Sequence, residues 1–248
     1  MEPTLKRRLV NSLPPWARSA VDSYIAKRNL KQFKNLPVKQ QFTRIYAEQI
    51  WGRSPNNKEP FYSGPGSHKP EVVNTYVSAV QAFLPNIGAR PSAVDLGCGD
   101  FAVGARLRHL CSTYVACDIV EPVIEFNRSR YAQLHVDFRT LDLTQDELPD
   151  ADVAFLRQVL QHLSNDQIAR ALERITPKFR YLILTEHLPW TSGFEPNWDQ
   201  KPGPDIRVPF SGVVVTAPPF NLVPKDAVEL CAVPEGGGKI VTMAYRLK

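Results

Sequence analysis

The 248-residue sequence predicts an α/β fold with a doubly wound, mostly parallel sheet. Short apolar runs alternate with amphipathic segments through the middle of the chain, which is typical of strands joined by crossover helices. Several apolar runs end in an acidic residue, and the first is followed by Gly-x-Gly. Such residues are expected where parallel strands end at a ligand-binding edge. Together, the alternation and the polar strand ends predict a sheet with a binding site at its carboxyl edge.

The N-terminal part of the chain predicts a helical extension. Apolar side chains recur at helical spacing over 17–33 and 39–49, and a loop rich in Gly, Pro, Ser and Asn follows over 51–68. Pro70 then begins a helix that is expected to run to about Leu84. We therefore expect a helical N-terminal extension or lid over 1–72 and a ligand-binding domain over 73–248.

The second unit is expected to alternate strands and helices and to end in a hairpin. The strands are predicted near 93–97, 114–119, 136–142, 152–158 and 179–186, and the helices near 101–111, 121–131 and 164–176. The proline-rich stretch 190–219 shows no helical pattern. Two further strands, over 227–233 and 239–247, are joined by the Gly-rich turn 235–238, which predicts a terminal antiparallel hairpin.

The most informative stretch is the first strand with its turn, which reads Ala-Val-Asp-Leu-Gly-Cys-Gly-Asp-Phe from Ala93 to Phe101. Glycine at 97 and 99 permits a tight turn and a close approach of a ligand to the backbone. A strand, this turn and a helix N-terminus form a nucleotide-type cradle. The pattern also fits a dinucleotide, but Asp95 and Asp100 would repel a pyrophosphate. Carboxylates suit a ligand with a cationic end, and S-adenosylmethionine carries an ammonium and a sulfonium.

The later strand ends agree with this interpretation. Asp118 ends the second strand and suits a ribose diol, a feature that NAD enzymes share. Asp142 ends the third strand, and the fourth runs into Arg-Gln-Val-Leu-Gln-His-Leu, residues 157–163. As a set, these strand ends resemble the class I S-adenosylmethionine-dependent methyltransferases over about Val73 to Lys248. The 157–163 run resembles the bacterial small-molecule branch of that superfamily.

The resemblance implies a Rossmann-like methyltransferase fold with S-adenosyl-L-methionine as cofactor. Gly97 and Gly99 would let the backbone approach the methionine part, and Asp95 would face its ammonium. Asp118 would accept bonds from the ribose hydroxyls, and Asp142 from the adenine amine. The full set of expected cofactor-binding residues is Asp95, Gly97, Cys98, Gly99, Asp118, Ile119, Asp142, Leu143, Arg157 and Gln158.

Three residues are candidates for catalysis. His162 follows the fourth strand, where a neutral imidazole could take a proton from the acceptor or could only pack. Glu186 and His187 end the fifth strand, either as a carboxylate–imidazole base or as water-exposed polar residues. The segment around Tyr46 and Trp51, with Ser63-Gly-Pro-Gly-Ser after it, resembles the N-terminal lid of bacterial small-molecule methyltransferases. These two aromatic residues could cover a ligand or could pack in the core.

The expected reaction is transfer of a methyl group to an oxygen or nitrogen of a small-molecule acceptor. Three alternatives stay open: a non-catalytic cofactor-binding partner protein, an NAD(P)-dependent oxidoreductase, and a protein or RNA methyltransferase. Residues 1–53 hold eleven Lys or Arg and three Asp or Glu, but no nucleic-acid module is recognisable, so nucleic acid is not the expected partner. This basic segment is either a solvated helical face or a site that attracts anions.

The composition of the chain indicates its cellular compartment and argues against a bound metal. No apolar run approaches the roughly 18 residues of a membrane span. The four cysteines form no C-x-x-C pair, so neither a metal site nor a disulfide framework is expected, and reduced thiols favour a cytoplasmic location. The sequence indicates no oligomeric state.

Overall fold

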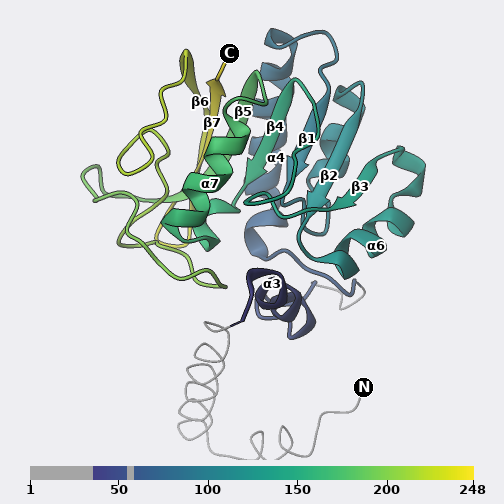
Figure 1. Ribbon diagram of the computed structural model, residues 1–248, viewed down its shortest axis with the longest axis horizontal. Helices are drawn as coiled ribbons and strands as arrows, with labels where there is room; N and C mark the ends of the chain where they lie inside the picture. Colours follow the sequence, from purple (N-terminus) through teal and green to yellow (C-terminus); the bar gives the residue numbers. More distant parts are fainter. Residues whose placement is uncertain (1–35, 55–58) are drawn as a thin grey trace, which may run out of the picture.

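The protein is described by a computed structural model that covers residues 36–54 and 59–248 (Figure 1). The helix expected at 17–33 lies outside these residues. A seven-stranded sheet in the order β3-β2-β1-β4-β5-β7-β6 forms the centre of the molecule. Its strands are Ala93–Leu96 (β1), Tyr114–Asp118 (β2), Asp137–Thr140 (β3), Val153–Arg157 (β4), Tyr181–Pro189 (β5), Asp226–Glu235 (β6) and Gly238–Arg246 (β7).

The pairing of the strands confirms the predicted fold class. Strands β1 to β5 pair in parallel, whereas β7 pairs with both β5 and β6 in antiparallel fashion. The hairpin between β6 and β7 turns at Gly236 and Gly237, whose φ angles of 40° and 80° are those that a tight hairpin turn needs. The chain is therefore a doubly wound α/β fold that ends in an antiparallel hairpin.

Helices cover both faces of the sheet (Figure 1). They are Val38–Ala47 (α3), Pro70–Phe83 (α4), Gly104–Leu107 (α5), Glu121–Arg130 (α6) and Asn165–Ile175 (α7), with short 3₁₀ turns at Pro65–Ser67 (η1), Leu84–Asn86 (η2), Arg108–Leu110 (η3), Ala132–Leu134 (η4) and Leu160–His162 (η5). Helix α7 buries Ile168 and Ile175 in one apolar cluster, to which α3 also contributes. Helix α4 buries Val77 and Val80 in a second cluster on the opposite face. The N-terminal helix α3 thus shares its core with the sheet.

Two predicted elements differ from those observed. The helix expected over 101–111 is an α-helix only at Gly104–Leu107, followed by the 3₁₀ turn η3. A Cβ on Gly104 would lie 2.3 Å from the Phe101 ring, so the packing of the turn determines this segment more than helical periodicity does. Strand β5 extends to Pro189, beyond the predicted end at 186, because it pairs with β7 along this whole length.

The site lies where the order of the sheet reverses. Strand β1 has β2 on one side and β4 on the other, so the crossover helices leave in opposite directions and open a crevice at the carboxyl ends. Helix α3 lies next to this edge of the sheet (Figure 1). Among the described residues, no helix combines the length and the apolar character that crossing a membrane would require.

Candidate active site

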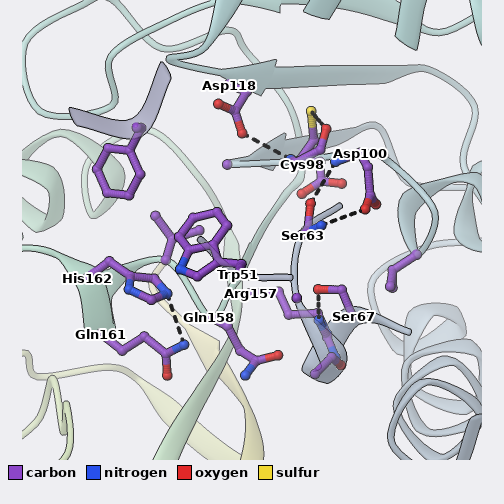
Figure 2. A pocket seen from close by; sticks show the side chains of 18 of the residues that line it. Trp51, Ser63, Ser67, Cys98, Asp100, Asp118, Arg157, Gln158, Gln161 and His162 are labelled. Carbon is purple, nitrogen blue, oxygen red and sulfur yellow. Dashed lines mark hydrogen bonds between the residues drawn. The ribbon is translucent and has the colours of Figure 1, made fainter. Parts of the chain in front are cut away.

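A cavity of about 430 Å³ opens at the carboxyl ends of β1, β2 and β4, and its side chains are shown in Figure 2. This volume lies within the usual range of small-molecule sites, roughly 300–1,000 Å³. The structure places all ten residues that were expected to bind the cofactor in its wall: Asp95, Gly97, Cys98, Gly99, Asp118, Ile119, Asp142, Leu143, Arg157 and Gln158. Tyr46, Trp51, His162 and His187 line the same cavity.

The Gly-rich turn after β1 needs glycine at both predicted positions. Gly97 and Gly99 have φ angles of 79° and 55°, in the left-handed region that other residues rarely adopt. A Cβ on Gly99 would lie 2.3 Å from Ser63 Oγ and 3.1 Å from Tyr46 Oη. The N-terminal segment therefore packs directly on the turn, which is a reason for Gly99 that the local sequence does not contain.

Two buried carboxylates face this turn. Asp118 accepts hydrogen bonds from the backbone N–H of Gly99 at 3.0 Å and of Val120 at 2.9 Å, and burial raises its pKa to about 6. Asp95 accepts one from Tyr114 Oη at 3.1 Å, and burial raises its pKa to about 7. An isolated buried carboxylate is unfavourable, so a cation or a pair of hydroxyl donors in the cavity would stabilise both ionised forms.

Asp100 and Asp142 are partly engaged by the protein itself. Asp100 Oδ2 accepts from the backbone N–H of Ser63 at 2.8 Å and lies 2.7 Å from His68 Nε2, while Ser63 Oγ accepts from the Asp100 backbone N–H at 2.9 Å (Figure 2). Asp142 Oδ1 accepts from both the backbone N–H and the hydroxyl of Thr144. Asp100 thus anchors the N-terminal loop, and Asp142 caps its own turn with one oxygen.

Arg157 and Gln158 end β4 and bring unpartnered polar atoms to the cavity. The Arg157 guanidinium donates to Ser67 Oγ at 3.1 Å and to the Gly66 carbonyl at 2.7 Å, and it lies over the Tyr76 ring. Its Nε and the Gln158 Oε1 are buried and have no hydrogen-bond partner in the described residues. Buried polar atoms without partners are costly, which indicates that a polar group of a ligand belongs beside them.

His162 lies in the turn after β4 with a defined tautomer. Its Nδ1 is 3.1 Å from the Gly203 carbonyl, which can only accept, so Nδ1 carries the proton and donates it. Nε2 is then the acceptor, and the Gln161 amide nitrogen donates to it at 3.3 Å. Burial lowers the His162 pKa to about 4, so the imidazole is neutral at pH 7. The Trp51 ring packs against it with a centroid separation of 5.1 Å.

The structure supports neither alternative for Glu186 and His187: both are buried, and they do not form a carboxylate–imidazole pair. Successive side chains of a strand point to opposite faces, so these neighbours cannot both face the cavity. His187 lines it, with Nε2 donating to the Glu235 carbonyl at 2.8 Å. Glu186 does not line it: its buried carboxylate accepts from the backbone N–H groups of Leu160 and Gln161, and burial raises its pKa to about 8.

The sequence and the fold were compared with those of known proteins. Residues 94–178 match the family model of the methyltransferase domain. A comparison with curated protein sequences gives no match. The N-methyltransferase NodS from Bradyrhizobium japonicum WM9, solved with S-adenosyl-L-homocysteine, is 14% identical with a TM-score of 0.59 over 83% of this chain and 98% of its own. Magnesium protoporphyrin IX methyltransferase (ChlM) from Synechocystis PCC 6803, solved with its S-adenosylmethionine, is 15% identical with a TM-score of 0.54 over 85% and 98%.

Residues 94–178 carry a methyltransferase domain. At these identities the solved structures establish the shared fold. Both of them are methyltransferases solved with S-adenosyl-L-homocysteine or S-adenosylmethionine bound.

The residues of the methyltransferase domain fit S-adenosylmethionine. The two buried carboxylates, Asp95 and Asp118, suit its positive charges and its ribose hydroxyls. The unpartnered Nε of Arg157 suits its carboxylate, and the apolar side chains of Ile119 and Leu143 provide walls for a flat adenine ring.

Sequence reasoning missed one residue that shapes the methyltransferase site. Arg207, in the proline-rich segment, is buried and donates to the carbonyls of Leu160, Gln161 and Leu163. Together with Glu186, which accepts from N–H groups of the same turn, it holds η5 and His162 from two sides. A buried arginine 45 residues beyond His162 has no local signature, so only the folded chain identifies it.

Proposed function

We propose that this methyltransferase transfers the methyl group of S-adenosylmethionine to an oxygen or nitrogen atom of a small-molecule acceptor. The observation that carries the proposal is the continuity of one cavity, which joins an acidic cradle to a pocket lined by aromatic rings. The cradle suits the cofactor, and the aromatic rings beside it suit an acceptor.

On the cofactor side, the proposal gives each residue a role that its position in the cavity wall supports. Gly97 and Gly99 let the backbone approach the methionine part, with Asp95 toward the ammonium and Arg157 toward the carboxylate. Asp118 accepts from the ribose hydroxyls with the lone pairs that Gly99 and Val120 leave free. The remaining members of the set, Cys98, Ile119, Asp142, Leu143 and Gln158, line the adenine and the methionine chain.

On the acceptor side, the protein orients the nucleophile of the acceptor and excludes water. The cofactor supplies an already activated methyl group, so the protein needs only to align a nucleophile with it and to keep water out. His162 lines this side of the cavity, where its Nε2 accepts from the Gln161 amide nitrogen and its low pKa makes it a weak base. His187 is a second polar group of this wall, and Glu186 serves the turn that holds His162.

The segment before the sheet is proposed as the lid. Tyr46 and Trp51 lie over the cavity, and Ser63 and Asp100 exchange hydrogen bonds that attach the segment to the Gly-rich turn. This supports a division into a lid over 1–72 and a methyltransferase domain over 73–248, although α3 shares its core with the sheet. All four cysteines are free, which supports a cytoplasmic location.

Calorimetry and a turnover assay test the proposal. We expect the protein to bind S-adenosylmethionine and not NAD, and to release S-adenosylhomocysteine only when an acceptor is present. Mass spectrometry of the acceptor then shows a gain of one methyl group on oxygen or nitrogen. Binding of NAD instead would favour an oxidoreductase. Cofactor binding without turnover, over a broad panel of acceptors, would favour a non-catalytic partner protein.

A further inference from the structure

We infer that the acceptor is an uncharged molecule with a planar aromatic ring, held by its ring in the part of the cavity that lies away from the acidic cradle. This inference rests on the proposed function and adds a substrate class to it. We call this part of the cavity the aromatic end. It is lined by Phe42, Trp51, His162, Leu163, Pro204 and Ile206.

The charges of the cavity are divided unevenly. Among the described lining residues, all ionised side chains lie outside the aromatic end: Asp95, Asp100, Asp118, Asp142, Arg157 and Glu235. His162 is the one titratable group inside it, and the Gly203 carbonyl fixes its neutral tautomer. A charged acceptor would lose its hydration in the aromatic end without gaining a partner, which is strongly unfavourable.

The rings of the aromatic end are arranged to receive another ring. The Trp51 indole is tilted by 42° against His162 at a centroid separation of 5.1 Å, and Phe42 meets His162 edge-on at 6.4 Å. Trp51 is half-buried and labelled at the centre of the cavity in Figure 2, so part of its surface faces the open space. Aromatic rings favour tilted and offset contacts of this kind with a bound ring. Pro204 and Ile206 provide the apolar wall.

The polar atoms of the aromatic end indicate where the acceptor's nucleophile lies. His162 Nε2 accepts from the Gln161 amide nitrogen, whereas Gln161 Oε1 is buried and has no partner among the described residues, so a hydroxyl on the ring can donate to Oε1. During transfer, the bond from this oxygen to the methyl carbon forms as the carbon–sulfur bond breaks. The hydroxyl proton leaves to water, and S-adenosylhomocysteine remains.

Three matched probes test this inference: 2-naphthol, its carboxylated analogue 6-hydroxy-2-naphthoate, and the saturated alcohol 2-decalinol. Each is titrated into the full-length protein after calorimetry has shown saturation with S-adenosylhomocysteine. We expect 2-naphthol to bind about tenfold or more tightly than either analogue, because one loses the ring contacts and the other buries a charge. Equal binding of the carboxylate or of the saturated alcohol, or no binding of 2-naphthol, overturns the inference.

Variants locate the binding. Trp51→Leu keeps an apolar side chain but removes the ring, and should weaken 2-naphthol binding about tenfold, while Trp51→Phe restores most of it. Trp190→Leu is the matched control, because Trp190 is 57% exposed and does not line the cavity. An equal loss in Trp190→Leu, or none in Trp51→Leu, contradicts the inference.

A gain of binding provides a second test. Ile206 is half-buried at the aromatic end, so Ile206→Lys can place an ammonium there without burying it fully. This variant should bind 6-hydroxy-2-naphthoate about fivefold more tightly than the parent protein and 2-naphthol less tightly. An unchanged preference overturns the inference. Failure to bind S-adenosylhomocysteine in the first step would instead contradict the proposed function, so the two failures are distinguishable.

Discussion

The two sides of the cavity are built in different ways. Most of the cofactor side comes from the ends of β1, β2 and β3, between Asp95 and Leu143, and the end of β4 adds Arg157 and Gln158. The acceptor side draws on α3, on η5 and on the proline-rich segment, which are far apart in the sequence. Acidic side chains mark the first, whereas neutral rings mark the second.

The two sides also differ in the contacts that fix their side chains. Asp118 accepts from the backbone N–H of Val120, two residues further on, and of Gly99, in the turn after the adjacent strand β1, so neighbouring strand ends hold the cofactor side. His162 is fixed by contacts that cross the fold: Gly203 accepts from its ring, Arg207 donates to its turn, and Glu186 accepts from that turn. Damage to one distant residue should therefore affect the acceptor side most.

The largest expected effect concerns Arg207. Replacing it with methionine leaves four backbone carbonyls and the Asn165 side-chain oxygen without their donor and removes a cation that interacts with Glu186, which should lower the free energy of unfolding by about 3 kcal/mol or more. Urea denaturation measures the change. The control is Arg170→Met, because Arg170 pairs with Asp166 on the exposed face of α7, where such pairs contribute about 0.3–0.5 kcal/mol. Similar losses of unfolding free energy in both variants would contradict the role of Arg207 in holding η5.

The next effect concerns the Gly-rich turn. In Gly99→Val the new side chain meets Ser63 and Tyr46 at once, and overpacking of this kind should weaken S-adenosylmethionine binding about ten- to a hundredfold. Gly88→Val is the control, since nothing lies within 4 Å of a Cβ at Gly88. Calorimetry compares the two. Normal affinity in Gly99→Val would show that the cradle lies elsewhere.

A smaller effect is expected at the ribose position. Asp118→Ala removes a charged acceptor, and charge-assisted hydrogen bonds contribute about 1.5–3 kcal/mol each, so the Kd should rise about tenfold or more. Asp137→Ala removes an exposed carboxylate at the start of β3 and should leave the Kd unchanged. An unaltered Kd in Asp118→Ala would exclude Asp118 as the ribose acid.

The smallest effect is a dependence of cofactor affinity on pH. With a pKa of about 7, Asp95 is mostly protonated at pH 6 and mostly ionised at pH 8, and the ionised form attracts the ammonium. Affinity should therefore rise several-fold over this interval, with release of a proton that calorimetry in buffers of different ionisation enthalpy detects. The variant Asp95→Asn should lose most of this dependence, and an identical profile in that variant would assign the titration to another group.

In the ligand-free protein the same shift has the opposite consequence for stability. Burial raises the pKa of Asp95 above its ordinary value of 3.8, so the folded state holds this proton more tightly than the unfolded state. Its contribution to stability is present at low pH and is lost as the pH rises toward about 7. His162, whose pKa is lowered to about 4, contributes in the other direction, because its stabilising effect is lost as the pH falls through 6.5.

The cofactor side could be predicted residue by residue because its signals are local. A glycine that must adopt a positive φ, and an acid at a strand end, are visible in a short stretch of sequence, as at Gly97 and Asp118. Prediction failed where partners come from elsewhere. Glu186 was expected beside His187 from adjacency alone, but strand alternation separates the two and directs Glu186 to η5. Arg207 and the contact of Ser63 with Asp100 left no local pattern at all.

The sequence by itself determined the alternation of strands and helices, the Gly-rich turn and the acidic strand ends, because backbone conformation and hydrophobic periodicity are encoded within a few residues of each position. Tertiary structure decided which side chains share the cavity and which groups titrate there. Burial and long-range hydrogen bonds exist only once distant segments meet. Contacts between distant segments keep His162 neutral and let Arg207 and Glu186 hold η5. They also place the aromatic end beside the acidic cradle.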